Sequence, residues 1–182
     1  MPTPTSCDNG EDLEPWYKLK GDDDTTLVFE SRFETANLRR AIQVHEYDYD
    51  LILKPDYLTK GYTQWFYFRA ANTRAGKNYR FSITNLVKPD SLYNHGMRPI
   101  MYSEIDAVRY NKGWTRNGKD ICYYANSIKR KGAFHYYTLT FNITFQHDHD
   151  TVYFAHSYPY TYSDLMRYLA RIEADPRTNC HF

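Results

Sequence analysis

The feature that most constrains this chain is the strict alternation of apolar and polar side chains between Phe134 and Phe145. The apolar positions are Tyr137, Leu139, Phe141, Ile143 and Phe145, and the polar positions begin at Tyr136 and continue through Thr138, Thr140, Asn142 and Thr144. Successive side chains of a β-strand point to opposite faces, so this pattern predicts a strand with one buried face. A second sheet must then cover that face.

The same period of two recurs along most of the chain after Thr26. Residues 47–53 and 79–84 alternate, and residues 64–71 are apolar on both faces, which is typical of a central strand. Leu38, Ile42 and Val44 are expected to share one face of a further strand. Residues 151–156 form another alternating run, and its separation from Phe145 by a short polar stretch predicts a β-hairpin.

A helix is predicted only at the C-terminal end. Thr161 and Asp164 have the spacing of a capping box. An apolar stripe follows at the positions i, i+3, i+4 and i+7, formed by Leu165, Tyr168, Leu169 and Ile172, and Pro176 ends the pattern. Together these signals predict a mainly β fold, an antiparallel β-sandwich of about nine strands with one C-terminal helix.

A chain of 182 residues has room for one domain with a sizeable core. We expect residues 1–24, which end in an Asp-rich run, to form a flexible acidic leader. Residues 25–175 form the sandwich, and residues 176–182 form a linker.

Charge and cysteine usage exclude several classes of protein. The 23 Lys and Arg side chains balance the 22 Asp and Glu side chains, so we expect no nucleic acid as a partner. No apolar run is long enough to span a membrane, and the opening "MPTPTSCDNGEDLEP" has no signal-peptide core, so we expect no membrane partner. Cys7, Cys122 and Cys180 have no motif spacing, which favours a reducing, cytoplasmic setting.

The segment "QHDHD" raises the question of a metal site, because imidazole and carboxylate groups are zinc ligands. His147 and His149 would need a third ligand, and His156, His135 or His95 could supply it. In the hairpin interpretation the segment is an exposed turn, with the two histidines on one side and Asp148 and Asp150 on the other. We therefore expect no metal ligands in this chain. The alternative is a self-contained metal hydrolase that uses His147, His149 and His156.

Two other features could form binding surfaces. Lys129, Arg130 and Lys131 are the one dense basic cluster, which is either a solvated loop or a contact for an acidic partner. The tryptophans Trp16, Trp65 and Trp114 could stack on a ligand if the chain were a free-standing β-sandwich binding module, although Trp65 fits the core better.

Several segments resemble the N-terminal domain of the cytosolic carboxypeptidases. The resemblance runs from about Leu27 to Leu169, and it includes "LVFESRFETANLRRAIQV" at 27–44, "SLYNHGMRPIMYSE" at 91–104 and the very specific "AHSYPYTYSDL" at 155–165. It implies a β-sandwich that directly precedes the catalytic domain of a zinc metallocarboxypeptidase. Such enzymes remove C-terminal or side-chain glutamates from tubulin and other acidic proteins.

The resemblance also implies that this chain is not an enzyme by itself. The family's zinc ligands are a His-x-x-Glu pair and a later His in the catalytic domain, and no His-x-x-Glu occurs here; the nearest pattern is His147-x-x-Asp150. We therefore expect no catalytic residue and no cofactor in this chain, with zinc in the absent catalytic domain. The implied partners are that domain and tubulin or other glutamate-rich proteins, in the cytoplasm, at microtubules or cilia.

The same resemblance suggests where the catalytic domain would dock. Tyr158, Tyr160 and Tyr162 surround Pro159 at the junction between the last strand and the helix that leads out of the domain. They pack either onto the sandwich as core or against the catalytic domain, and Tyr158 and Tyr160 are the best interface candidates.

Overall fold

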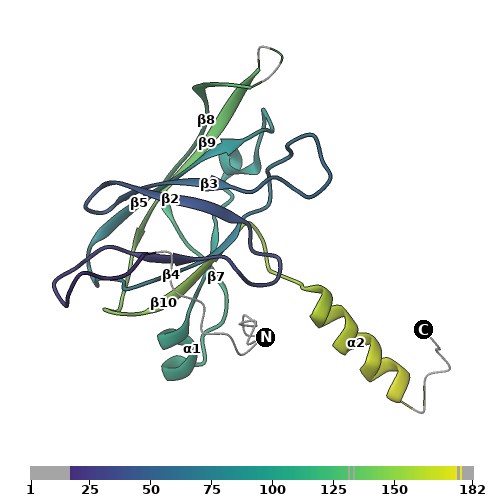
Figure 1. The fold of residues 1–182 in the computed structure, drawn as a ribbon. Coiled ribbons are helices and arrows are strands. Elements are labelled where there is room, and N and C mark those ends of the chain that lie inside the picture. The colour runs from purple at the N-terminus through teal and green to yellow at the C-terminus, as the bar shows by residue number, and fades with distance from the viewer. Residues whose placement is uncertain (1–16, 131, 133, 176, 178–182) are drawn as a thin grey trace.

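Two five-stranded sheets face each other in the computed structural model, which describes residues 17–130, 132, 134–175 and 177 (Figure 1). The first sheet has the order β1 (Val28–Glu30), β4 (Tyr67–Ala71), β10 (Thr151–Ala155), β6 (Ile100–Ser103) and β7 (Thr115–Arg116). The second has the order β2 (Leu38–His45), β3 (Asp48–Leu53), β5 (Asn78–Leu86), β9 (His135–Thr144) and β8 (Lys119–Lys129). Neighbouring strands are antiparallel except β3 and β5. The predicted mainly β sandwich is confirmed.

The core lies between the sheets and is rich in aromatic rings. Phe154 of β10 contacts Phe81 of β5 and Phe141 of β9 at centroid distances of 5.4 and 6.1 Å. All three rings are fully buried. The alternation in β9 therefore predicted its inward face correctly, because Leu139, Phe141, Ile143 and Phe145 are buried and Tyr137 packs against them.

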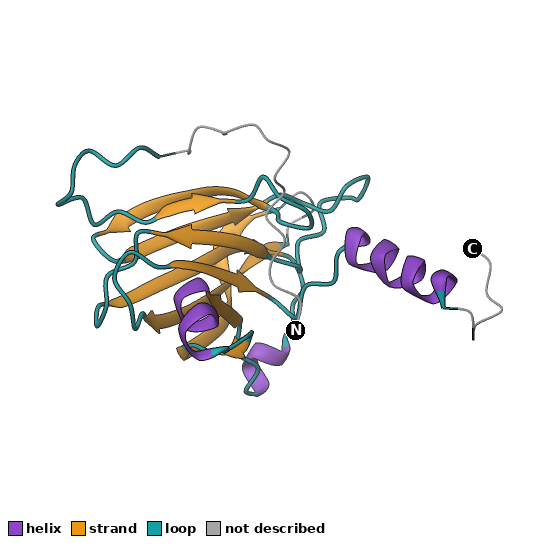
Figure 2. Cartoon of the chain, turned by 90° about the horizontal axis from the view of Figure 1, so that it is seen from below, coloured by secondary structure: helices purple, strands orange, loops and turns teal. Residues whose placement is uncertain are grey.

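A second apolar cluster covers the outer face of the first sheet. Tyr67, Tyr102 and Tyr153 alternate along their strands with core residues and are nearly inaccessible to solvent. Trp114 and Phe33 close over them from adjoining loops. The central strands β4, β6 and β10 are consequently buried on both faces for most of their length. Figure 2 shows that no described helix covers the outer face of the second sheet.

The predicted hairpin between β9 and β10 is wrong, because the two strands lie in different sheets. β9 pairs with β5 and β8, and β10 pairs with β4 and β6. The reason is that β10 is apolar on both faces: Val152 and Phe154 point into the core, and Tyr153 belongs to the outer cluster. Only a central position in the first sheet buries both sets, so residues 145–150 cross from one sheet to the other.

Two further expectations change. Ile42 and Val44 do not share the buried face of Leu38, since they are 40% and 47% exposed. Register shifts in the β2–β3 pair, between Leu38 and Arg40 and between Gln43 and His45, interrupt the alternation. Two helices were not predicted from the sequence, α1 (Glu104–Tyr110) and the 3-10 helix η1 (Leu92–His95).

The predicted C-terminal helix is α2 (Tyr162–Ala174), and both hydrogen bonds of its capping box are present. It projects away from the sandwich (Figure 1). Most of the expected leader and linker, together with Pro176, Cys7 and Cys180, lies outside the described residues; in the described part of the leader, Asp24 accepts hydrogen bonds from Tyr17 and Lys20. None of the helices in the described residues is long and apolar enough to cross a membrane.

The face assignment of β9 makes a direct prediction about stability. Phe141→Lys should lower the free energy of unfolding by about 3 kcal/mol or more, because it places an unpaired ammonium group in the core. Thr140→Lys is the matched control, since Thr140 is only partly buried on the opposite face. Chemical denaturation of both variants measures the difference, and equal losses would contradict the assignment.

Candidate functional site

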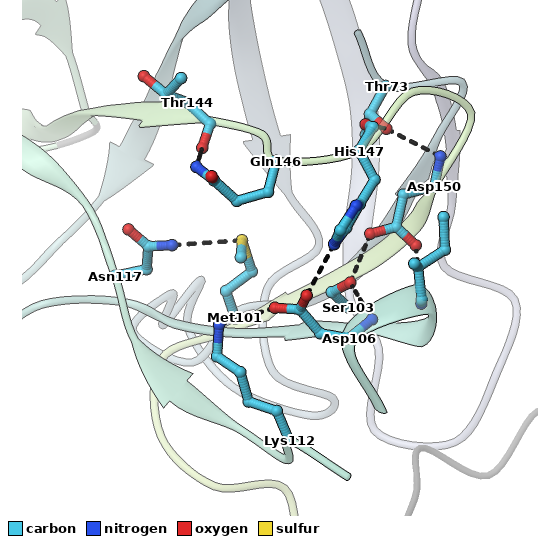
Figure 3. Close-up of polar contacts among 11 residues, drawn as sticks. Thr73, Met101, Ser103, Asp106, Lys112, Asn117, Thr144, Gln146, His147 and Asp150 are labelled. Atoms are coloured by element: carbon cyan, nitrogen blue, oxygen red, sulfur yellow. Dashed lines mark hydrogen bonds and ion pairs between the residues drawn. The ribbon is translucent and has the colours of Figure 1, made fainter. Parts of the chain in front are cut away.

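The histidine-rich segment is a connection between the sheets and not an exposed tip. His147 points toward α1, where its Nε2 lies 2.7 Å from Asp106 Oδ1. The Nζ of Lys112 donates to the other oxygen of the same carboxylate at 2.7 Å. Figure 3 shows the imidazole and the ammonium group converging on Asp106 from two sides.

Asp150 holds the other end of the connection. Its buried carboxylate accepts hydrogen bonds from Ser103 Oγ at 2.5 Å and from the Ile105 amide at 3.2 Å. The hydroxyl of Thr73 accepts from the Asp150 amide and donates to the His147 carbonyl, at 2.9 and 2.8 Å. We call the set Thr73, Ser103, Asp106, His147 and Asp150 the crossover clamp (Figure 3).

The clamp also fixes the start of α1. Ser103 is the N-cap of this helix, and its Oγ accepts a hydrogen bond from the Asp106 amide at 3.0 Å. Burial would raise the pKa of Asp106, but the hydrogen bonds from Lys112 and His147 outweigh that effect and hold the pKa below its usual value. The carboxylate is therefore the charged centre of the clamp.

The expected sidedness of "HDHD" is wrong. His147 and Asp150 both belong to the clamp, whereas Asp148 accepts from the Ala75 amide at 2.8 Å. The Nδ1 of His149 lies 3.3 Å from an Arg74 nitrogen, and the His149 backbone is left-handed with φ 55°. The segment does not continue as a strand, so its side chains do not alternate between two faces.

The candidate metal ligands do not gather at one place. His156 follows β10 at the end remote from the clamp, where its Nδ1 is 3.3 Å from the Tyr93 hydroxyl. His135 lies 3.0 Å from the Asn126 carbonyl, and His95 is exposed beside Asp90. Across the part of the chain that the structure describes, no three His, Cys, Asp or Glu side chains are placed to hold a metal ion. These residues therefore do not fit a zinc site.

The clamp does not have the geometry of a nucleophilic site either. A serine nucleophile needs a base within hydrogen-bond reach of its hydroxyl. Ser103 instead donates to Asp150, and His147 contacts a different carboxylate, Asp106. The arrangement is suited to holding α1 and the connection in place.

The three tyrosines after β10 form an exposed junction. Tyr158, Tyr160 and Tyr162 are 53%, 59% and 68% exposed, so in this chain they do not pack onto the sandwich as core. Their backbone is nevertheless anchored, because Thr161 is buried and the Ser163 amide donates to Glu34 Oε1 at 3.0 Å. The chain leaves the sandwich at a fixed point with three rings facing solvent.

The apolar stripe of α2 has little cover. No residue of the helix is buried. Leu165 and Tyr168 of the stripe are 37% and 56% exposed, Leu169 and Ile172 are partly buried, and Met166 beside the stripe is 45% exposed. The helix continues directly from the tyrosine junction (Figure 1). Junction and helix thus make one continuous aromatic and aliphatic surface outside the sandwich.

The remaining candidates are separate from this surface. Lys129 and Arg130 lie at the end of the β8–β9 hairpin, and Lys131 lies outside the described residues. Trp114 is buried, and Trp65 is partly buried with its indole nitrogen donating to the Thr35 carbonyl. These two tryptophans are therefore not free to stack on a ligand, and Trp16 is outside the described residues.

Comparison with known proteins gives one consistent family. A family model described as the cytosolic carboxypeptidase N-terminal domain matches residues 29–157. Cytosolic carboxypeptidase 2 of Mus musculus is 52% identical over 158 residues, which cover 87% of this chain and 18% of the relative. Cytosolic carboxypeptidase 3 of Bos taurus is 51% identical over 153 residues, 84% of this chain and 15% of the relative. The chain thus spans less than a fifth of either relative.

Solved structures share the fold. A metallo-carboxypeptidase from Burkholderia cenocepacia matches with a TM-score of 0.57 and 18% identity, over 83% of this chain and 34% of that one. A metallo-carboxypeptidase from Pseudomonas aeruginosa matches with a TM-score of 0.53 and 18% identity, over 81% and 34%.

The crossover clamp predicts that the histidines differ in their effect on stability. His147→Ala should lower the free energy of unfolding by about 1–2 kcal/mol, because it removes a hydrogen bond to a poorly accessible carboxylate. His95→Ala is the control and should change it by less than about 0.5 kcal/mol, since that side chain is exposed. Urea denaturation of both variants tests this, and an unchanged His147→Ala would show that the clamp adds no stability.

His156 predicts a loss of stability in mild acid. Burial lowers the pKa of its imidazole, and Arg116 and Lys88 lower it further. Because the folded-state pKa is below the unfolded value of about 6.5, the unfolded chain takes up the proton first as the pH falls. The contribution to stability is therefore complete above about pH 7 and is lost as the pH falls through the folded-state pKa.

His156→Gln removes this titration while keeping an acceptor for Tyr93. The variant should show a smaller drop in the free energy of unfolding between about pH 7 and about pH 5 than the unaltered protein. Denaturant titrations at each pH measure the drop, and parallel curves for the two proteins would rule out His156 as the cause.

Proposed function

Because this chain belongs to the cytosolic carboxypeptidase N-terminal domain family, we propose that it is the non-catalytic N-terminal accessory domain of a zinc carboxypeptidase. The observation that carries the proposal is the family match over residues 29–157, which covers all of the sandwich except the first residue of β1. The scattered histidines support it, because the residues that the structure describes offer no set of ligands for zinc. Zinc would then be held by another part of the full-length protein.

The proposed parent enzyme removes C-terminal or side-chain glutamates from tubulin and other acidic proteins. The cytosolic relatives support a location in the cytoplasm, and a tubulin substrate would bring the enzyme to microtubules or cilia. Within that enzyme the domain would support the folding of its neighbour and shape access to the active site.

We place the contact with the catalytic domain at the tyrosine junction and α2. An isolated helix of 13 residues is marginal in water, so α2 needs a partner for its apolar stripe. Tyr158, Tyr160 and Tyr162 supply exposed aromatic area of the kind enriched at protein interfaces. Both features follow β10 directly, on the C-terminal side of the sandwich.

A free-standing binding module has less support. Trp114 and Trp65 are committed to the outer cluster, so they offer no stacking platform. The histidines give no support to a self-contained metal hydrolase, since His147 and His156 lie at opposite ends of β10.

The interface proposal predicts different outcomes in the domain and in the full-length protein. Tyr158→Ala with Tyr160→Ala should leave the melting temperature of this chain nearly unchanged, because both rings are exposed. The same pair should lower the stability or the glutamate-releasing activity of the full-length enzyme. Tyr57→Ala, at a 90% exposed position in the loop between β3 and β4, is the matched control.

Two results would contradict the proposals separately. If the double substitution lowers the stability of the isolated domain as much as that of the full-length protein, the two rings stabilise the sandwich itself. Release of glutamate from an acidic peptide by this chain alone, with zinc added, would mean that the domain is catalytic.

A further inference from the structure

A long stretch of this nearly neutral protein contains no acidic residue. Between Asp120 and Asp148 there is neither Asp nor Glu, whereas Lys129, Arg130 and Lys131 lie in the middle of the stretch. It corresponds to β8 and β9, which form a hairpin at the edge of the second sheet. In Figure 1 the hairpin rises beyond the rest of the sandwich, at the end opposite α1.

The end of the hairpin exposes apolar side chains as well as cations. Lys129 is paired with His135, so by alternation Ile128 and Tyr136 point to the opposite face, as do Arg130 and Phe134. Ile128 and Phe134 are 51% and 69% exposed. Leu139 and Phe141 of β9 point into the core, so Tyr136 is on the outer face of the sheet. We call Ile128, Arg130, Phe134 and Tyr136 the hairpin patch; Lys129 is next to it in the chain but points to the opposite face.

Arg130 is held in a defined position. Its guanidinium carbon lies 5.5 Å from the centroid of the Tyr136 ring, and its amide donates to the Phe134 carbonyl at 2.7 Å. A guanidinium that rests on an aromatic ring keeps its edge available for a carboxylate, which it can bind with two parallel hydrogen bonds. In the described part of the chain, neither Lys129 nor Arg130 has an ion pair.

We propose that the hairpin patch is a binding surface for an extended acidic polypeptide segment that also carries apolar side chains. Arg130 would pair with a carboxylate of the segment, Lys129 would add positive charge at the tip from the opposite face, and Phe134 and Ile128 would cover its apolar groups. This proposal does not rest on the proposed function, because the surface and its ligand can be measured on this chain alone.

Charge complementarity selects this occupant. A second copy of the chain would bring the same cations face to face, which repels. Away from the tip, the outer face of β9 continues with Thr140 and then Asn142, which is bonded to the Asp120 carboxylate, so the acid-free surface extends along the strand as far as Thr140 instead of ending in an apolar tip. An extended peptide can follow such a surface, whereas insertion into a lipid bilayer would use only the tip.

The test uses the full 182-residue chain and a fluorescein-labelled peptide in which glutamate alternates with leucine. Fluorescence anisotropy should show binding that weakens as salt is added. Lys129→Glu with Arg130→Glu should weaken binding by about tenfold or more. Arg109→Glu with Arg171→Glu makes the same change in net charge at exposed positions on α1 and α2, and should leave binding within about twofold.

A second pair of variants tests the apolar half of the patch. Ile128→Ser with Phe134→Ser should weaken binding of the same peptide by about tenfold. The melting temperature should stay nearly unchanged, because both side chains are exposed. A peptide with glutamine in place of glutamate should not bind. Circular dichroism of every variant confirms that it is folded.

Three results would overturn the proposal. One is equal binding by the hairpin and control variants, which would place any acidic ligand elsewhere. Another is failure of the unaltered chain to bind the peptide at low salt. The third is stronger binding to phosphatidylserine vesicles than to the peptide, abolished by the hairpin variants, which would make the patch a membrane contact.

Discussion

The burial of β10 on both faces is the constraint on which the rest of the structure depends. Phe154 packs across the sandwich against Phe81, and Tyr153 packs on the opposite side under the outer aromatic cluster. A strand with two apolar faces is stable only where both are covered, so β10 must lie between β4 and β6. The chain therefore cannot return from β9 by a hairpin and has to cross between sheets.

The crossing explains why a short segment holds so many polar side chains. A connection that passes the edge of two packed sheets carries backbone groups that water reaches poorly, and each needs a partner. Thr73 and Ser103 supply those partners to His147 and Asp150, and Asp106 ties the connection to α1. The polar side chains of the segment thus serve to hold the crossing in place: His147 contacts Asp106, whereas Asp150 accepts from Ser103, which produces the composition of a metal site without its geometry.

The features that depend on neighbouring residues could be predicted from the sequence, whereas those that depend on strands far away in the chain could not. The inward face of β9 and the capping box of α2 follow from neighbours within a few residues, and both predictions are confirmed. The pairing of β10 depends on β4 and β6, which are far away in the chain, so the short polar stretch before β10 led to the wrong prediction of a β9–β10 hairpin. α1 has only seven residues, and its signal is the single N-cap at Ser103. The tyrosine junction could be found in the sequence, but its exposure depends on Thr161 and Glu34 fixing the path of the chain.

The two surfaces, one at the β8–β9 hairpin of the second sheet and the other after β10 of the first sheet, suit two kinds of contact. A partner joined covalently after α2 is present at a high effective concentration, so a small stripe and three rings can hold it without a large interface. A separate polypeptide has no such advantage and must be attracted from solution, which is the effect of a cationic surface without competing carboxylates. In the proposed arrangement the sandwich between them is the spacer: its aromatic core fixes the distance from the hairpin patch to α2, and so where a bound acidic segment lies relative to the catalytic domain.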